Sequence, residues 1–407
     1  MPLARELQDT LTMVLAGERG ERLEPLTRRR AKAALPFGGV YRIIDFALSN
    51  CLHSGLRRIH VLTQHRARSL EEHIRSGWSF LPPRLGHFVD LRPPHHKGSG
   101  WYQGTADALH QNVDALQASA ARHVLVLPGD VLHRLDYGEL LAEHLETGAA
   151  LTIGAAPPVG ERFDRFGCLG VNDDGTVSAI LEKPVTPTPQ GTSCLASSGV
   201  MLFEMQELVT RLRMDAEMGP GASHDLALDV VPRMVDEVSV RAHLCSESPD
   251  GPRPSWVDLQ SIDDYFEANL DLCGPDPHLD LYDPRWPLYT LRHDNPPAKT
   301  MLGRESGRPG EVIDSLLCAG AVVQGSRVQH SLLGSRVHTG EGAEIEDCVL
   351  FTGVEVGAGA HLRRTIVDKW VQIPPGVRIG HDLESDGDRF TVTSSGIVVV
   401  PSGYRFR

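Results

Sequence analysis

The sequence predicts an α/β protein in two parts, a Rossmann-like, mostly parallel sheet domain followed by a C-terminal left-handed parallel β-helix. Three observations lead to this prediction. The 407 residues suffice for two or three domains. Short aliphatic runs alternate with longer amphipathic ones up to about residue 240, and small aliphatic residues recur every six positions after Pro297. The expected divisions are 1–272 for the sheet domain, 273–310 for a linker or packing strap, and 311–407 for the β-helix.

Four apolar runs in the first part have the length of buried strands, at 11–16, 59–63, 124–127 and 151–154. Helical spacing predicts helices at 46–53, 67–74, 105–118, 137–146 and 262–270. Alternation of the two implies βαβ crossovers and a parallel sheet covered on both faces. Ligands of such sheets bind beyond the carboxyl ends of the strands, so we expect a site in the loops after Leu15, Leu62 and Leu127.

The second part shows a hexapeptide period. Val354, Ala360 and Ile366 are six positions apart, as are Ile373 and Ile379, and glycine is frequent among the neighbouring residues. A period of six with glycine is typical of a β-helix in which each side of a coil takes one repeat. An antiparallel sandwich with regular turns is the alternative. A β-helix of this kind would serve assembly or regulation, with acyltransfer as the exception.

Composition excludes several classes of protein. Lys+Arg 40 against Asp+Glu 53 gives a net charge of −13, and no long basic run offers a footing for nonspecific nucleic-acid or anionic-membrane binding. No apolar run approaches the roughly 18 residues of a membrane span, and a cytoplasmic location is expected. The seven cysteines contain no C-x-x-C pair, so buried reduced thiols are expected. The histidines lack metal-ligand spacing, and His95 with His96 is expected to be a solvated loop.

The loop after the first predicted strand has the features of a phosphate-binding turn. Gly17 and Gly20 would let backbone amides approach phosphate groups, and Arg22 adds positive charge. The run 28–32, Arg-Arg-Arg-Ala-Lys, places four more cations nearby, although a solvated basic loop is an alternative. The Gly-Lys-Ser/Thr of a Walker loop is missing.

Two acids complete a set suited to one reaction class. Asp130 follows the strand at 124–127 and could hold Mg²⁺ against a triphosphate, although an Asp at this place is often a helix cap. Asp258 is a second carboxylate before the predicted helix at 262–270. Glu182 and Lys183 set a carboxylate beside an ammonium group. Acids for a metal and cations for phosphates suit nucleotidyl transfer, which demands positioning and charge neutralisation more than covalent chemistry.

Long motifs give a resemblance to a known family. They are Phe-Gly-Gly-Val-Tyr-Arg-Ile-Ile-Asp-Phe-Ala-Leu-Ser-Asn-Cys at 37–51, Gly-Trp-Ser-Phe at 77–80, Trp-Tyr-Gln-Gly-Thr-Ala-Asp at 101–107 and Tyr-Asp-Pro-Arg-Trp-Pro at 282–287. With these motifs the chain resembles bacterial glucose-1-phosphate adenylyltransferase, also called ADP-glucose pyrophosphorylase. The similarity runs from Met13 to Val400 and includes the Ser-Gly-Ile-Val tail at 395–398.

The resemblance implies the reaction of ATP with α-D-glucose 1-phosphate to give ADP-glucose and pyrophosphate, in glycogen synthesis, by a cytoplasmic homotetramer that needs Mg²⁺. It implies that Arg22 and Lys32 neutralise the ATP phosphates in the loop of Gly17 and Gly20, and that Asp130 and Asp258 hold the metal. The positions that match the family's glucose 1-phosphate contacts are Tyr102, Gly167, Glu182, Lys183 and Ser197. The candidates for an effector site for phosphorylated metabolites are Arg29, Arg30 and Arg389, with surface solubility as the alternative role.

The chain departs from the family pattern where phosphate binding is expected. Glu18 replaces the second glycine of Ala-Gly-Gly-x-Gly-Thr-Arg-Leu, Glu21 replaces the threonine, and Ala33 replaces a proline. After Asp258 the usual Val-Gly-Thr is Leu-Gln-Ser at 259–261. A carboxylate about 4 Å from a triphosphate, at an effective dielectric near 20, would cost about 4 kcal/mol. The alternatives are therefore an active enzyme that tolerates these changes and an impaired paralogue that acts as a regulatory subunit. A hexapeptide acyltransferase is a third reading, without a His-bearing coil motif to support it.

Overall fold

The computed structural model describes residues 2–94, 100–157, 167–182, 193–219, 221–245 and 255–406. The chain forms two compact units, and each is described by itself. The first contains residues 1–18, 46–67 and 78–256, and the second contains residues 19–45, 68–77 and 257–407. The boundaries expected from the sequence at 272 and 310 remain predictions.

The first unit is built on a nine-stranded sheet in which four neighbouring strands are parallel. Strands β5, β4, β1 and β6 lie side by side in parallel, and β11 continues the sheet antiparallel to β6. The strands are β1 (Leu11–Ala16), β4 (Arg58–Thr63), β5 (Phe88–Arg92), β6 (His123–Pro128), β8 (Leu151–Ala156), β9 (Gly167–Val171), β10 (Val177–Glu182), β11 (Ser193–Glu204) and β12 (Val240–Leu244). Two short strands, β7 (Leu132–Arg134) and β13 (Ser255–Val257), pair separately. The predicted α/β fold with a parallel-sheet core is confirmed, although the whole sheet is mixed, because β11 is antiparallel to β6, β8 and β9, and β10 is antiparallel to β9.

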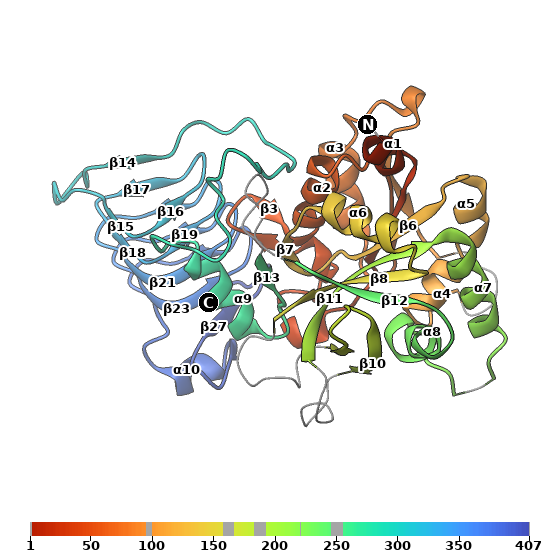
Figure 1. The fold of residues 1–407 in the computed structure, drawn as a ribbon. Helices are drawn as coiled ribbons and strands as arrows, with labels where there is room; N and C mark the ends of the chain where they lie inside the picture. The colour runs from red at the N-terminus through yellow and green to blue at the C-terminus, as the bar shows by residue number, and fades with distance from the viewer. Residues whose placement is uncertain are drawn as a thin grey trace. The chain divides into compact units, whose positions relative to one another are not determined.

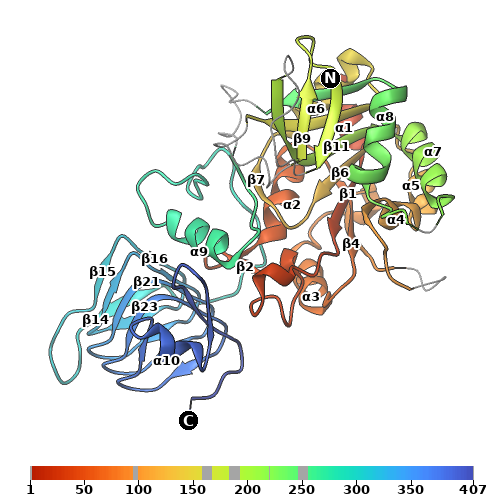
Figure 2. The same ribbon diagram turned by 90° about the horizontal axis from the view of Figure 1, so that it is seen from below.

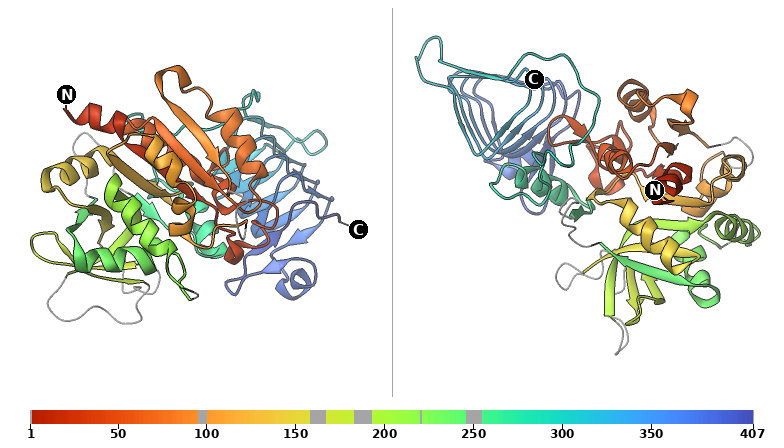
Figure 3. Two further views of the ribbon diagram at one scale, coloured as in Figure 1. Left: turned by 90° about the vertical axis from the view of Figure 1, so that its right-hand side faces the viewer. Right: turned by 45° about the horizontal axis from the view of Figure 1, so that its top comes forward.

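Helices cover both faces of this sheet, as Figure 1 shows and the left view of Figure 3 shows from the side. They are α1 (Pro2–Asp9), α2 (Ile43–His53), α4 (Thr105–His110), α5 (Val113–Ala118), α6 (Tyr137–Thr147), α7 (Met205–Ala216) and α8 (Val231–Glu237). One core cluster joins Met13 and Val126 of the sheet with Leu109 of α4 and Leu212 of α7. Since β1 is buried along nearly its whole length, its sequence is a continuous apolar run and not an alternating one.

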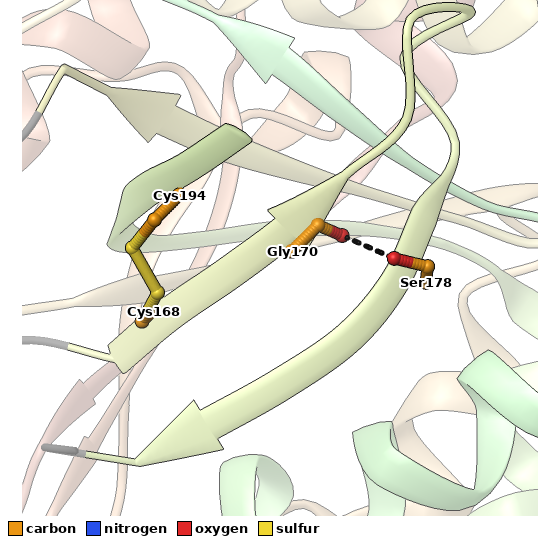
Figure 4. Close-up of a disulfide and its surroundings, with 4 residues drawn as sticks. All are labelled: Cys168, Gly170, Ser178 and Cys194. Carbon is orange, nitrogen blue, oxygen red and sulfur yellow. Dashed lines mark hydrogen bonds between the residues drawn. A yellow bond between two sulfur atoms is a disulfide. The ribbon is translucent and has the colours of Figure 1, made fainter. Parts of the chain in front are cut away.

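The cysteine prediction was wrong at one pair, because Cys168 and Cys194 form a disulfide (Figure 4). Strands β9 and β11 are antiparallel, and Cys168 pairs with Ala196 while Cys194 pairs with Gly170. The two cysteines are therefore diagonal neighbours on one face of the sheet, with Cα atoms 6.0 Å apart. The spacing of 26 residues between the two cysteines does not predict this strand register from the sequence. The other five cysteines are free, as expected.

The second unit contains the β-helix, whose strands pair in parallel from coil to coil. The partner of Glu344 is His361, 17 positions later, and the partner of Val322 is His338, 16 positions later. Val354, Ala360 and Ile366, the six-residue series, are all fully buried. The parallel pairing confirms the β-helix and excludes the antiparallel sandwich, since among the described strands from β14 to β27 only the short β26 runs antiparallel to its neighbour, β27.

Figures 2 and 3 show the stacked coils of this unit, with β14 at one end of the stack and α10 at the other. The strands are β14 (Lys299–Met301), β15 (Glu311–Ile313), β16 (Leu316–Leu317), β17 (Val322–Gln324), β18 (Arg327–Gln329), β19 (Leu332–Leu333), β20 (His338–Thr339), β21 (Glu344–Leu350), β22 (Glu355–Val356), β23 (His361–Val367), β24 (Gln372–Ile373), β25 (Arg378–Ile379), β26 (Thr391–Val392) and β27 (Val398–Val400). The other elements of the unit are β2 (Pro36–Phe37), β3 (Tyr41–Arg42), α3 (Arg68–Gly77), α9 (Ile262–Asp271) and α10 (Leu383–Gly387). In the described residues of both units, no helix has the length and apolarity to cross a membrane.

Candidate active site

The loop after β1 is shaped by Gly20. Its φ of 65° lies in the left-handed region, and a Cβ atom there would stand 2.9 Å from Cβ of Lys32 and 3.1 Å from Cγ2 of Thr27. Thr27 Oγ1 donates a hydrogen bond of 2.7 Å to the Gly20 carbonyl oxygen. Glycine is therefore required at this position by both conformation and space. Because Gly20 has no side chain, the loop packs directly against the segment that carries Lys32.

Lys32 and Asp258 come together although 226 positions separate them in the sequence. Lys32 is only 5% exposed, and it begins a short 3₁₀ turn, Lys32–Ala34. Its Nζ lies 3.9 Å from Oδ1 of Asp258, at the margin of an ion pair. The structure thus brings together the cation assigned to the ATP phosphates and one of the two acids assigned to the metal.

Gln260 connects this pair to Arg22. The Gln260 Nε2 group donates a 2.6 Å hydrogen bond to Oδ2 of Asp258, and its Oε1 accepts a 3.2 Å hydrogen bond from Nη1 of Arg22. Arg22, Gln260, Asp258 and Lys32 therefore form one continuous chain of polar contacts in the second unit. The sequence identified Gln260 as a departure from the family pattern without assigning it a role. The feature of the sequence that could have suggested a role is the position of Gln260, two residues after Asp258, where a long amide side chain replaces the glycine of the family pattern.

Asp130 lies in the first unit, just beyond the carboxyl end of β6. Gly129 makes the turn possible, because its amide donates a 2.8 Å hydrogen bond to the Leu15 carbonyl oxygen of β1. A Cβ at Gly129 would stand 3.0 Å from that same oxygen. Asp130 itself is 8% exposed. The backbone that leads into Asp130 is thus fixed by a close strand-to-strand turn, at the edge of the sheet where the sequence predicted this residue.

Three positions assigned to the sugar phosphate meet in one part of the sheet. Gly167 begins β9 and pairs with Glu182 at the end of β10. Ser197 lies on β11 next to Ala196, which pairs with Cys168, the neighbour of Gly167. The disulfide of Cys168 therefore lies directly beside these positions. Lys183 lies outside the described residues.

Tyr102 is held in the first unit by hydrogen bonds to Gln64, the residue after β4. The Tyr102 amide donates a 2.7 Å hydrogen bond to Oε1 of Gln64. Its hydroxyl donates to the Arg92 carbonyl oxygen at 3.1 Å and accepts from Asn112 at 3.3 Å. Burial raises the pKa of Tyr102, so the hydroxyl remains a protonated hydrogen-bonding group at neutral pH. Gln64 is a second positioning residue that the sequence did not suggest.

The three effector candidates have different surroundings. Arg29 is exposed. Arg30 is 6% exposed, and its Nη2 lies 2.8 Å from both carboxylate oxygens of Asp368. Arg389 is paired with Asp386 at 2.7 Å and lies over the ring of Phe390.

Two further cations lie near Arg30. Burial, followed by the charge of Arg30, lowers the pKa of Arg42. Burial, followed by the charges of Arg42 and Arg30, lowers the pKa of Lys369 to about 7. Asp368 opposes this shift as the nearby anion. Two carboxylates, Asp45 and Asp368, act on these three cations, so the positive charge is only partly compensated, and an anionic ligand would relieve the remainder.

Comparison with known proteins supports the same chemistry. Residues 11–274 match the family described as nucleotidyl transferase, and residues 296–400 match the family described as GlmU-like, C-terminal hexapeptide. The chain is 43% identical to glucose-1-phosphate adenylyltransferase 2 of Vibrio cholerae over 98% of this chain and 99% of that protein.

Relatives in other bacteria show the same coverage. The chain is 42% identical to the glucose-1-phosphate adenylyltransferase of Rhodopirellula baltica, over 98% of this chain and 91% of the relative. It is 44% identical to glucose-1-phosphate adenylyltransferase 1 of Alkalilimnicola ehrlichii, over 98% and 95%. Nothing in these comparisons favours an impaired regulatory subunit. With a nucleotidyl transferase domain, a hexapeptide domain and this identity over nearly its whole length, the chain belongs to the glucose-1-phosphate adenylyltransferase family of nucleotidyltransferases.

Proposed function

We propose that this chain transfers the adenylyl group of ATP to α-D-glucose 1-phosphate, with release of pyrophosphate and formation of ADP-glucose. The observation that carries the proposal is the approach of Lys32 to Asp258, with Gln260 linking Asp258 to Arg22. A triphosphate and its metal ion need cations and a carboxylate within one small region. The second unit supplies both, in a chain whose full-length relatives are named for this reaction.

The reaction is a displacement at phosphorus. A phosphate oxygen of glucose 1-phosphate attacks the α-phosphorus of ATP, the bond to the bridging oxygen of the β-phosphate breaks, and pyrophosphate leaves with the bonding electron pair. The attacking oxygen is already ionised at neutral pH, so no general base is required. Lys32 and Arg22 neutralise the negative charge that moves onto the departing pyrophosphate. The work of the protein is therefore positioning and charge neutralisation.

On the family resemblance, Asp130 and Asp258 are the residues that would hold Mg²⁺. Carboxylate oxygens are the hard ligands that this ion prefers, and Oδ1 of Asp258 lies 3.9 Å from Nζ of Lys32. Asp130 is nearly buried at the end of β6, where side-chain motion is restricted. When bound, Mg²⁺ supplies positive charge to the triphosphate and to the leaving pyrophosphate.

The sugar phosphate is assigned to Tyr102, Gly167, Glu182, Lys183 and Ser197. Support comes from β9, β10 and β11, which carry three of these positions at adjoining places in the sheet. In this assignment Lys183 is the point charge on the phosphate, and Glu182 accepts hydrogen bonds from sugar hydroxyls.

Further features of the assignment follow from family membership. We assign the reaction to glycogen synthesis in the cytoplasm, carried out by a homotetramer. Phosphorylated metabolites would act as effectors through Arg29, Arg30 and Arg389. The crowding of Arg30, Arg42 and Lys369, which Asp45 and Asp368 only partly compensate, supports an anionic effector at that place.

A single assay tests the function. The purified chain is given glucose 1-phosphate, Mg²⁺ and each of the four common nucleoside triphosphates in turn, and released pyrophosphate is measured. We expect release with ATP as the preferred nucleotide, dependence on Mg²⁺, and a loss of at least a hundredfold in Asp258→Asn. Absence of turnover with all four nucleotides, in the presence and absence of phosphorylated effectors, would instead favour an impaired regulatory subunit. Acetyl transfer from acetyl-CoA would favour the acyltransferase reading.

A further inference from the structure

A cluster of metal-ligating side chains lies in the first unit at the amino end of β6. His123 is the first residue of β6, and Glu204, its partner in the antiparallel register, is the last residue of β11. His144 comes from α6. One ligand atom of each residue lies within 4.8 Å of the other two. Two imidazoles and one carboxylate on three different elements form a donor set that suits zinc and similar transition metals.

The two imidazoles are buried and incompletely hydrogen-bonded. Each histidine is 1% exposed. Both ring nitrogens of His123 and Nε2 of His144 lack a hydrogen-bond partner. A buried polar atom without a partner costs about 1–3 kcal/mol, so two such rings in one place call for an occupant that satisfies one nitrogen of each. This observation is independent of the spacing of the three residues.

The surroundings prepare His144 to act as a ligand. Its Nδ1 lies 2.8 Å from Oγ1 of Thr152 on β8. If Nδ1 carries the proton and donates it to Thr152, then the lone pair of Nε2 is left for a metal ion. Such an outer hydrogen bond fixes the ring and its tautomer in many metal sites.

The charge around the cluster favours a cation on balance. Glu204 Oε1 lies 3.6 Å from Nε2 of His123, and Glu6 Oε2 of α1 lies 3.6 Å from Nδ1 of the same ring. One cation opposes this, because Arg122 Nη2 lies 3.2 Å from Glu204 Oε1. The Arg122 side chain is largely exposed and can turn into water at small cost.

We propose that His123, His144 and Glu204 bind one transition-metal ion of the Zn²⁺ class, which ties α6 to β6 and β11. Metal–ligand bonds of about 2.0–2.1 Å place tetrahedral ligand atoms roughly 3.4 Å apart. The 3.6 Å between His123 and Glu204 is already close to this value, whereas a separation at the 4.8 Å limit of the cluster must close by about 1.4 Å. A rotation of the imidazole or carboxylate side chains is enough for such a movement.

The site is separate from the catalytic loops. It stands at the amino end of β6, and Asp130 follows the carboxyl end of the same strand. A strand of this length spans roughly 20 Å at about 3.3 Å per residue. The proposed role is therefore structural, and loss of the ion is expected to leave turnover with Mg²⁺ nearly unchanged.

The experiment measures Zn²⁺ binding by the full chain. Chelator-treated protein in Mg²⁺-containing buffer is titrated with Zn²⁺ by calorimetry, and Co²⁺ is used as an absorbing probe of imidazole ligation. We expect one Zn²⁺ per chain, an affinity at least tenfold weaker in His144→Asn and in Glu204→Gln, and a rise in melting temperature that only the wild type shows in full. Mg²⁺ does not compete, because it avoids imidazole ligands.

His60→Asn is the matched control. His60 is a buried imidazole on β4 that lies 3.5 Å from the Asp90 carboxylate. Among the described residues it belongs to no cluster of three metal-ligating side chains, so its loss should leave Zn²⁺ affinity unchanged. If His144→Asn fails to fold by circular dichroism, Glu204→Gln at a partly exposed position and the Co²⁺ spectrum of the wild type still decide. Equal Zn²⁺ affinity in the wild type, His144→Asn, Glu204→Gln and His60→Asn would mean that Zn²⁺ binds adventitiously at the surface, and this result overturns the proposal. Failure of the wild type to bind Zn²⁺ overturns it as well.

Discussion

The Nζ atom of Lys32 lies 3.9 Å from Oδ1 of Asp258. Lys32 is almost completely buried, so this charge has given up most of its contact with water and depends on nearby anions. The carboxylate is such an anion while the site is free of substrate. A triphosphate with its metal ion offers Lys32 a phosphate and offers Asp258 a cation. The pair is therefore suited to exchange partners when Mg-ATP binds.

Gln260 is expected to weaken metal binding at Asp258. Its Nε2 group occupies Oδ2 of the carboxylate at 2.6 Å, and this hydrogen bond must be given up or shared when an ion binds. A hydrogen bond to a charged group contributes about 1.5–3 kcal/mol. Gln260→Ala should therefore lower the Mg²⁺ concentration for half-maximal activity, by roughly tenfold or more, in a Mg²⁺ titration of initial rates. A higher Mg²⁺ requirement would mean that Gln260 orients the carboxylate productively.

Glu18 is expected to oppose the triphosphate. The side chain is exposed, in the loop that follows β1, at a place where the family pattern has glycine. Glu18→Gly should raise kcat/KM for ATP at least tenfold, because a repelling charge is removed and the backbone gains freedom. Glu21→Gln is the control, since Glu21 already lies 3.5 Å from Arg19, and it should change kcat/KM by less than threefold. An unchanged rate in Glu18→Gly would remove the repulsion argument.

The disulfide is expected to stabilise the first unit. Closing a loop of 26 residues reduces the entropy of the unfolded chain and contributes about 3 kcal/mol. Reduction should lower the melting temperature of the wild type, and it should have no effect on a Cys168→Ser, Cys194→Ser double variant. Thiol titration of the denatured protein should find five thiols before reduction and seven after it. Seven thiols before reduction would show that the bond does not form in the isolated protein.

Lys369 is expected to make stability depend on pH. Burial, helped by Arg42 and Arg30 and opposed by Asp368, lowers its pKa from 10.5 to about 7. Between these values the unfolded chain binds the proton that the folded chain lacks, so stability rises with pH from about 7 towards 10.5. Lys369→Met should remove this rise and increase the free energy of unfolding at pH 7.5 by about 1 kcal/mol or more. Urea unfolding of the wild type and of Lys369→Met at pH 7.5 and 9 measures the free energy of unfolding. An equal change with pH in the two proteins would contradict the prediction.

The strands of the parallel sheet could be predicted from the sequence because each one is a short run of apolar residues, which is a local pattern. β1, β4, β6 and β8 are apolar runs buried on both faces, and their predicted bounds are within two residues of those observed. The helix predicted at 105–118 was wrong in its middle, where Asn112 interrupts it between α4 and α5. The Asn112 side chain donates to the Ala108 carbonyl oxygen and to Tyr102, and this tertiary contact overrides helical spacing.

The features that escaped prediction depend on pairing between distant segments. The antiparallel register of β9 and β11 brings Cys168 to Cys194, and no local pattern determines such a register. The role of Gln260 requires the loop of Arg22 and the turn of Asp258 to meet. The assignment of Arg22, Lys32, Asp130 and Asp258 rested on residue type and family pattern. The contacts of Lys32, Asp258 and Arg22 now add geometry to three of the four.

The most direct test of the central claim is kcat/KM for ATP in Lys32→Gln, measured by pyrophosphate release at saturating glucose 1-phosphate. Arg28→Gln is the matched control, an exposed cation of the same segment that lies 3.8 Å from Glu24. If Lys32 neutralises the triphosphate in the transition state, its loss should lower kcat/KM at least a hundredfold, while Arg28→Gln changes it less than threefold. A change of less than threefold in Lys32→Gln, in a folded protein, would contradict the account.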